Sequence, residues 1–216
     1  ISSSSIIPCS MKTTRATYTP ELEGKTLAQI DAAMAGMTTA GRIDQINWPE
    51  QYPVAPQTDF ILVHTDKMLY VRFEVKGELP LSTKCNDLEL VNEDACVEIF
   101  IGDKDNTHYW NFEFNPAGVC NASHRKERKV DVVRLNPEQL ASIQRYGQQL
   151  CAAHWTLLVG IPLALIDLDL NKEHTRRANL YKCGDKTPMK HYASWNPINA
   201  PAPAFHLPEF FGEIQF

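Results

Sequence analysis

The sequence predicts an all-β fold in which antiparallel strands form a sandwich, together with one or two short helices. From Asp59 onward, short β-rich runs alternate with turn residues, which is typical of an antiparallel sandwich rather than of βαβ units. The 216 residues fit a single large β domain. Hydrophobic residues make up 44% of the chain and charged residues 22%, so the chain can bury a substantial core.

The N-terminal part of the chain differs from the rest in its pattern. Residues 1–16 are Ser-rich and unpatterned, which predicts a flexible lead before a single domain over residues 17–216. Between Gly24 and Gly36, apolar residues recur at helical spacing and predict one short amphipathic helix. Three prolines in residues 47–56 predict an irregular segment, because proline cannot donate to a β-ladder.

The remaining segments are predicted strands joined by turns. Residues 60–64 and 68–75 form one pair of strands around a turn at 65–67, and residues 96–101 and 108–115 form a hairpin around the turn at 102–106. Further strands are expected at residues 118–123, 129–135, 154–161, 175–183 and 211–216, with brief helical turns starting at Asn136 and after Pro162.

The hairpin carries an unusual set of polar residues. Alternation places Val97, Ile99, Trp110, Phe112 and Phe114 on one face, and it places Glu98, Asn111, Glu113 and Asn115 on the other. These short carboxylates and amides hydrogen-bond hydroxyl groups in fixed directions, which indicates a binding surface. A solvated outer face remains the alternative explanation.

Aromatic residues gather in the C-terminal third of the chain. The candidates are Tyr181, His191, Tyr192, Trp195, Phe205 and His206. Several prolines make most of this segment a predicted loop, and aromatic side chains on loops beside a polar sheet face suit the rim of a binding site. A sugar needs both features, an apolar surface for its C–H face and directional partners for its hydroxyls. Core packing is the alternative for each aromatic residue.

Charge and hydropathy exclude two classes of function. The net charge of −5 and the interruption of the basic run at residues 124–129 by Glu127 argue against a nucleic-acid partner. No transmembrane segment is expected, because the longest apolar candidate, residues 157–170, contains Gly160, Pro162 and Asp167. The first residues, ISSSSIIPCSMKTT, lack the pattern of a signal peptide.

Six cysteines are present, but none lies in a CxxC pair. The sequence therefore predicts no zinc site, and most of the cysteines are interpreted as small buried hydrophobic residues.

Several motifs, taken together, resemble the family 9 carbohydrate-binding modules and their Bacteroidetes-type relatives. In order along the chain they are DACVEIFIGD, YWNFEFNPAG, WTLLVGIP, NLYKCGD, HYASWNPI and FHLPEFFGEIQF, and the resemblance covers about residues 47–216. It implies an immunoglobulin-like, DOMON-related β-sandwich that binds the ends of glucan or xylan chains and often carries structural calcium. Such modules support a glycoside hydrolase, lack catalysis of their own, and act in the periplasm, at the cell surface or in secreted form.

The resemblance also implies site residues. The glutamate of the family's D-S-V-E strand corresponds to Glu98, a polar residue on the next strand to Glu113, and a late stacking tryptophan to Trp195. The family's other stacking tryptophan corresponds to Asn92, so either Trp48, Trp110 or Tyr109 compensates or the familiar ligand is not bound. The predicted carbohydrate-binding residues are Glu98, Glu113, Asn115 and Trp195, followed by Asn111, His191 and Arg72.

Three other interpretations stay open. A glycoside hydrolase could use Glu98 and Glu113, since a retaining pair is about 5 Å apart, but cross-strand neighbours have that spacing anyway. A haem or redox module would use His64, His108, His191 or Met189 as axial ligands, although no recognisable His/Met pair is present. Asp103, Asp105 and Asn106 have calcium-ligand chemistry, but a hairpin turn uses the same residues.

Overall fold

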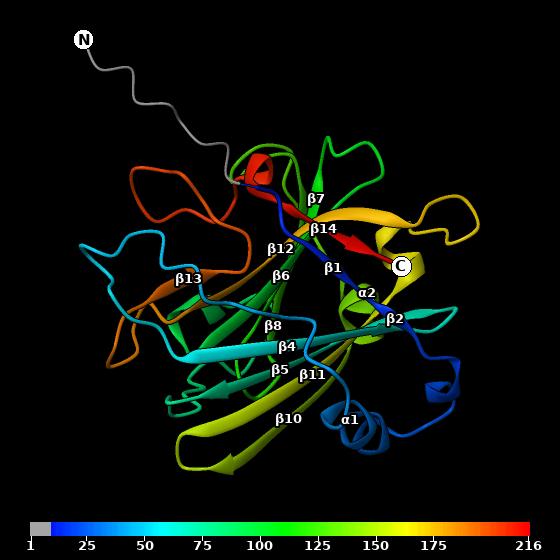
Figure 1. Cartoon of the computed structure of the whole chain (residues 1–216), viewed down its shortest axis with the longest axis horizontal. Helices are drawn as coiled ribbons and strands as arrows, with labels where there is room; N and C mark the ends of the chain where they lie inside the picture. The colour runs from blue at the N-terminus through cyan, green and yellow to red at the C-terminus, as the bar shows by residue number, and fades with distance from the viewer. Residues whose placement is uncertain (1–9) are drawn as a thin grey trace.

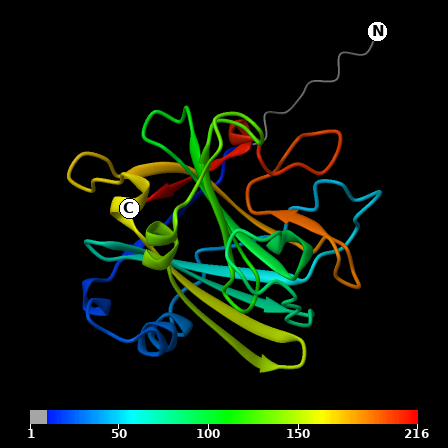
Figure 2. The same cartoon turned by 180° about the vertical axis from the view of Figure 1, so that it is seen from behind.

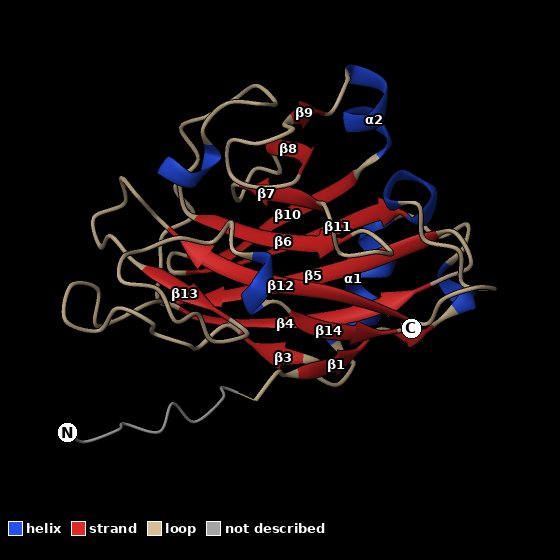
Figure 3. Cartoon of the chain, turned by 90° about the horizontal axis from the view of Figure 1, so that it is seen from above, coloured by secondary structure: helices blue, strands red, loops and turns tan. Residues whose placement is uncertain are grey.

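The computed structural model describes residues 10–216 and shows two β-sheets packed face to face (Figure 1, Figure 3). The predicted β-sandwich with two short α-helices is therefore confirmed. No helix in the described range is long and apolar enough to cross a membrane.

One sheet has eight strands and supports the candidate site. Its strands, in spatial order, are β1 (Thr13–Arg15), β14 (Gly212–Gln215), β12 (Thr175–Cys183), β6 (Cys96–Gly102), β7 (Tyr109–Phe114), β8 (Cys120–Arg125) and β9 (Val133–Arg134), and β13 (Tyr192–Ser194) also pairs with β12. The predicted hairpin of residues 96–101 and 108–115 is confirmed as the β6–β7 pair.

The other sheet has six strands. Its order is β10 (Gln144–Cys151), β11 (His154–Pro162), β5 (Met68–Lys76), β4 (Gln57–His64) and β2 (Thr17–Tyr18), with β3 (Gly41–Arg42) also paired with β4. The hairpin of β10 and β11, coloured yellow-green, forms one edge of the fold in Figure 2. Two strand pairs depart from the antiparallel pattern, because β1 runs parallel to β14 and β2 runs parallel to β4.

The predicted flexible lead is too long. Residues 13–15, which the prediction placed in it, form β1 because the edge of β14 offers them backbone hydrogen-bonding partners. The amide of Ala16 continues this pairing by donating to the carbonyl of Gln215 at 2.8 Å. In Figure 1 the blue β1 runs beside the red β14. The part of the prediction that concerns residues 1–9, including Cys9, lies outside the described residues.

The two α-helices are α1 (Leu27–Ala35) and α2 (Pro137–Ser142), and both were predicted. Thr26 and Asn136 each cap a helix by accepting from the third amide of the helix, while the glutamine at that position bonds back to the cap residue. Short 3₁₀ turns are η1 (Pro20–Leu22), η2 (Val91–Glu93), η3 (Leu163–Ile166) and η4 (Pro208–Phe210).

The main core lies between the sheets and follows the predicted alternation. Val97, Ile99 and Phe112 from the eight-stranded sheet belong to one buried cluster with Phe73 and Trp155 of the six-stranded sheet. Burial of each such side chain contributes about 1.5–3 kcal/mol. The alternate residues of β6 and β7 consequently point away from the core, onto the outer face of the eight-stranded sheet.

Candidate functional site

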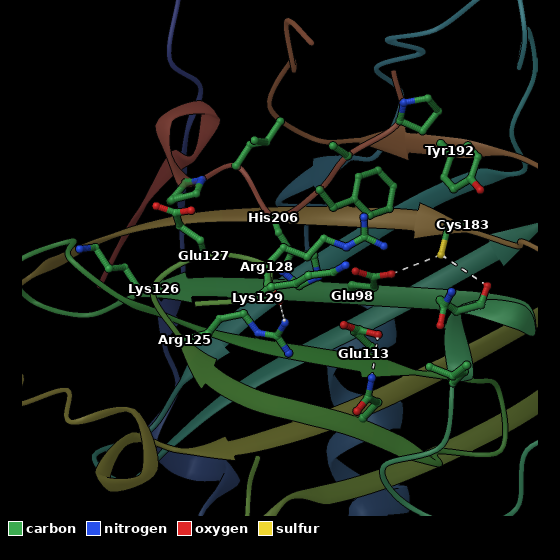
Figure 4. A pocket seen from close by; sticks show the side chains of 18 of the residues that line it. Glu98, Glu113, Arg125, Lys126, Glu127, Arg128, Lys129, Cys183, Tyr192 and His206 are labelled. Atoms are coloured by element: carbon green, nitrogen blue, oxygen red, sulfur yellow. Dashed lines mark hydrogen bonds between the residues drawn. The ribbon is translucent and has the colours of Figure 1, made fainter. Parts of the chain in front are cut away.

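A pocket of about 960 Å³ lies on this outer face. The strands β6, β7, β8 and β12 contribute Glu98, Glu113, Asn121 and Cys183 to its lining. Residues 125–129 and 203–209 form its walls. Figure 4 shows Glu98 and Glu113 facing the same space, with Arg125 and Arg128 beside them.

The floor of the pocket is a row of three residues in direct register, Glu98, Glu113 and Asn121, and the buried Tyr181 continues this row on β12. Tyr181 pairs with Glu98, Glu98 with Glu113, and Glu113 with Asn121. The sequence-based expectation that Glu98 and Glu113 share a surface therefore agrees with the register. The surface is recessed, since the two residues are only 3% and 6% exposed.

The surroundings of the two carboxyl groups favour their neutral forms. Burial is the largest cause that raises the pKa of Glu98 well above its usual value, and burial also raises the pKa of Glu113 to about 6. Asn111 donates to Glu113 Oε1 at 3.0 Å and Asn121 donates to its Oε2 at 3.3 Å. Within residues 10–216, no lysine, arginine or histidine forms an ion pair with either carboxyl group. Two neighbouring acids therefore share a recessed floor with no ion-pair partner among the described residues.

Glu113 is expected to make the stability of the protein fall as the pH rises from about 4.5 to about 6. Its pKa is raised from 4.5 to about 6, so in this range the folded chain binds more protons than the unfolded chain. The loss in the free energy of unfolding reaches its full value, about 2 kcal/mol, above the pKa that Glu113 has in the folded protein. Urea denaturation of the wild type and Glu113→Gln between pH 4 and pH 7 measures it, because the variant lacks this loss. Parallel pH profiles for the two proteins would contradict the raised pKa.

Three of the six aromatic candidates line the pocket, namely Tyr192, Phe205 and His206. The ring of Phe205 stacks on Tyr181 with centroids 4.4 Å apart, so Tyr181 supports the wall from below. Burial lowers the pKa of His206 to about 3, which keeps its ring neutral at physiological pH. These residues supply the apolar surface that the sequence analysis expected from the C-terminal loops.

Trp195 does not lie at the pocket, contrary to expectation. Its side chain is 3% exposed and packs in the main core, edge-on to Phe60 at 6.0 Å. Its backbone amide donates to the carbonyl of Leu180, and this pairing continues the β12–β13 ladder and turns the indole toward the space between the sheets. A stacking role for Trp195 is therefore wrong.

None of the three residues expected to replace the missing tryptophan presents its ring to the pocket. Trp48 is 6% exposed and donates its indole N–H to the carbonyl of Ala200 at 2.8 Å. Trp110 belongs to the main core and Tyr109 is fully buried. Asn92 itself does line the pocket, where it donates to Asp185 Oδ2 at 2.8 Å. The two-indole clamp of the resemblance is absent from the described part of this chain.

Asn111 and Asn115 share the face of Glu113 but act within the protein. Asn111 orients Glu113 through its amide, while its own Oδ1 is buried without a partner among the described residues. Asn115 donates to Asp94 Oδ2 and to the carbonyl of Lys84, both at 3.0 Å, and so fastens a loop to the end of β7. Neither residue lines the pocket.

His191 and Arg72 lie away from the pocket. His191 is fully buried and its Nε2 lies 2.9 Å from Lys182 Nζ. Arg72 is on β5 of the other sheet, where its Nε donates to Asp31 Oδ1 of α1 at 2.8 Å. The predicted contribution of these two residues to the site is not supported, because both are committed to internal ion pairs or hydrogen bonds.

The basic run is the feature of the site that sequence reasoning missed. Arg125, Lys126, Arg128 and Lys129 all line the pocket, and none of them forms an ion pair with a carboxylate of the described chain. Arg125 Nε is buried without a hydrogen-bonding partner in the same set of residues. The run was visible in the sequence, but only the β8–β9 connection shows that it lies beside Glu98 and Glu113.

The turn at Asp103 does not fit a calcium site. The carboxylate of Asp103 accepts from the amide and hydroxyl of Thr107 and from the amide of His108. These contacts give Asp103 the role of a turn-forming residue, and Asn106 adopts a positive φ of 53°, as turn residues do. The turn interpretation of residues 102–106 is the better one.

Comparison with known proteins identifies a family and a curated relative. The model of carbohydrate-binding family 9 matches residues 28–216. A protein of Arthroderma benhamiae described as an extracellular protein is 29% identical over 185 residues, which cover 78% of this chain and 82% of the relative.

Solved structures show the same fold. A protein from Bacteroides uniformis, provisionally described as carbohydrate-binding, is 26% identical with a TM-score of 0.85, and the match covers 96% of this chain and 100% of that one. A family 9 carbohydrate-binding module from Caldicellulosiruptor kristjanssonii in complex with glucose has a TM-score of 0.61 and 14% identity, with 94% and 95% of the two chains covered. The same organism's module with cellotriose has a TM-score of 0.64 and 13% identity, over 94% and 93% of the chains.

Proposed function

The chain belongs to carbohydrate-binding family 9, and on that premise we propose that it binds a carbohydrate in the pocket above Glu98 and Glu113. The observation that carries the proposal is the register of Glu98, Glu113 and Asn121, three directional polar side chains on adjacent strands of one recessed floor.

The chemistry of the pocket suits a sugar residue. A neutral carboxyl group both donates and accepts, as a sugar hydroxyl does, so Glu98 can make paired hydrogen bonds, whereas Glu113, with a pKa of about 6, acts mainly as an acceptor at neutral pH. Arg125 Nε and Asp185 Oδ1 are buried lining atoms without partners among the described residues, and they add a donor and an acceptor. Phe205 and Tyr192 offer apolar surface to the C–H face of the ring. We propose a glucan- or xylan-type oligosaccharide as the ligand.

The cations of residues 125–129 favour a particular variant of this ligand. Four positive side chains line the pocket without carboxylate partners among the described residues, and they attract carboxylate or sulfate substituents. The proposed ligands therefore include glycans that carry uronate or sulfate groups.

The setting of this function is proposed to be outside the cytoplasm. The Arthroderma benhamiae relative is described as extracellular, and polysaccharides are encountered there. We place the chain in the periplasm, at the cell surface or in the secreted fraction, where it supports glycan degradation beside a glycoside hydrolase.

The purified chain is expected to bind at least one class among glucans, xylans, mannans, host glycans and uronate-containing polymers on a glycan array. Trp48 serves as a fluorescent reporter, since its ring lies 6.4 Å from the pocket residue Phe205. Glu98→Gln and Glu113→Gln should each weaken binding by about tenfold or more, because a charged or buried hydrogen-bonding group is worth about 1.5–3 kcal/mol. Isothermal titration measures the affinities.

A matched control is Glu74→Gln, which changes a partly buried glutamate on the six-stranded sheet. It should bind like the wild type. Absence of any array signal, or equal affinity in all three variants, would reject the proposal for this pocket.

Hydrolysis is the second candidate, favoured by the direct register of Glu98 with Glu113 and by their differently raised pKa values. One acid and one base are what a glycosidase pair requires. Turnover of aryl glycosides by the same samples, abolished in Glu98→Gln, would place catalysis above binding. Binding without turnover retains the non-catalytic function.

A further inference from the structure

We propose that Cys96, Glu98 and Cys183 bind a zinc ion at the floor of the pocket. Their ligand atoms, two Sγ and one carboxylate oxygen, all lie within 4.8 Å of one another and all three residues are buried. Glu98 Oε1 is 3.2 Å from Cys183 Sγ and 3.7 Å from Cys96 Sγ.

These separations fit tetrahedral coordination. With Zn–S distances of about 2.3 Å and Zn–O distances of about 2.0 Å, the ligand atoms of a tetrahedral site lie about 3.5–4 Å apart. The three groups therefore need only small side-chain rotations to meet one ion. Two thiolates select zinc rather than calcium, which takes six to eight oxygen ligands.

The fold explains why the sequence hides this cluster. Cys96 and Cys183 are directly opposed partners on β6 and β12, and Glu98 follows Cys96 by two residues on the same face. Zinc sites that are recognisable in sequence use closely spaced cysteines, whereas here the two thiols come from strands distant in the chain. Because no CxxC pair is present, the sequence alone did not predict a zinc site.

The electrostatics of the cluster favour a cation. Two thiols and a carboxyl group are fully buried together, and none of them forms an ion pair with a described lysine, arginine or histidine. Zinc binding would ionise these groups, because each thiol releases its proton to solvent and binds as thiolate, and the divalent charge then balances the buried anions.

The pocket provides both the entry path and the remaining coordination position. Glu98 and Cys183 line it, whereas Cys96, the first residue of β6, does not. A site with three protein ligands keeps one position open for water or for an incoming oxygen. In Figure 4 the dashed line from Cys183 to Glu98 marks the edge of the cluster that faces the pocket.

The test uses the full chain, reduced and freed of metal, then incubated with zinc chloride and passed through a desalting column. Inductively coupled plasma mass spectrometry should find about one zinc per chain in the wild type. Cys96→Ser and Cys183→Ser should each lose most of it. A control with Cys9→Ser, Cys85→Ser and Cys151→Ser combined should keep the wild-type content, since Cys85 and Cys151 are exposed and neither lines the pocket. Near-ultraviolet circular dichroism verifies that each variant is folded.

Less than about a tenth of an equivalent of zinc in the folded wild type, or unchanged zinc in folded Cys96→Ser and Cys183→Ser, would overturn the proposal. Two variants distinguish the zinc proposal from the carbohydrate proposal. Glu113→Gln should lose carbohydrate affinity and keep the zinc, whereas Cys96→Ser should lose the zinc.

Discussion

Replacement of Trp195 by alanine is expected to lower the free energy of unfolding by about 3–5 kcal/mol and to leave carbohydrate affinity unchanged in the protein that remains folded. The indole is 3% exposed and fills the core edge-on to Phe60. A Cβ built on Gly212 would lie 2.6 Å from the indole ring, so the backbone approaches the ring too closely for another side chain to fill the space. The cavity left by the substitution should therefore stay open. Urea denaturation followed by circular dichroism measures the loss.

Phe205→Ala is the matched comparison, because Phe205 is an aromatic residue of the same C-terminal segment that does line the pocket. Its free energy of carbohydrate binding should fall by more than its free energy of unfolding. If Trp195→Ala instead kept its stability and lost carbohydrate binding, the indole would be a stacking platform after all, and the placement of the site would be wrong.

Glu78→Ala is expected to cost a similar amount, about 3–5 kcal/mol, because it leaves Lys182 buried without its carboxylate. Lys182 is completely buried, with its Nζ 2.8 Å from Glu78 Oε2 and 3.0 Å from the carbonyl of Cys183. His191 does not replace the carboxylate, because its Nε2 accepts from Lys182 as a neutral ring whose pKa burial lowers to about 3. Thermal or urea unfolding detects the effect.

The double variant Glu78→Leu with Lys182→Met is the control for this prediction. Removal of both charges leaves no unpaired ion, so most of the lost stability should return. If the free energy of unfolding of Glu78→Ala alone lay within about 1 kcal/mol of the wild-type value, Lys182 would have found water or another partner, and the prediction would be wrong.

Much of the fold could be predicted from the sequence because alternation determines which face of a strand is buried. On β6 and β7 every second residue is a large apolar side chain, and these residues form the core as expected. The register of Glu98 with Glu113 followed from the short turn between the strands, which leaves little freedom to slip. The shared outer face of Glu98 and Glu113 could therefore be predicted from the sequence.

Other strands have no alternation of apolar residues that would reveal them in the sequence. β10 has the sequence QRYGQQLC, mostly polar, because it is an edge strand that buries little and gains its stability from pairing with β11. β1 is three residues long and exists only because β14 lies beside it. Such strands are made by tertiary pairing, and local propensity does not reveal them.

The candidate site, too, was only partly predictable from the sequence. The floor could be predicted, whereas the positions of Trp195 and the basic run depend on how the connections after β8 and β12 fold back. An aromatic residue in a Pro-rich segment suits a rim and a core equally well from sequence alone. The opposition of Cys96 and Cys183 depends on sheet order, which places β12 beside β6.

The most direct test of the account is a crystal structure of the protein soaked with the strongest glycan from the array. The account predicts sugar density above Glu98 and Glu113, within hydrogen-bonding distance of both carboxyl groups and against the ring of Phe205. Well-defined sugar density at another surface, with the floor of this pocket empty, would contradict it.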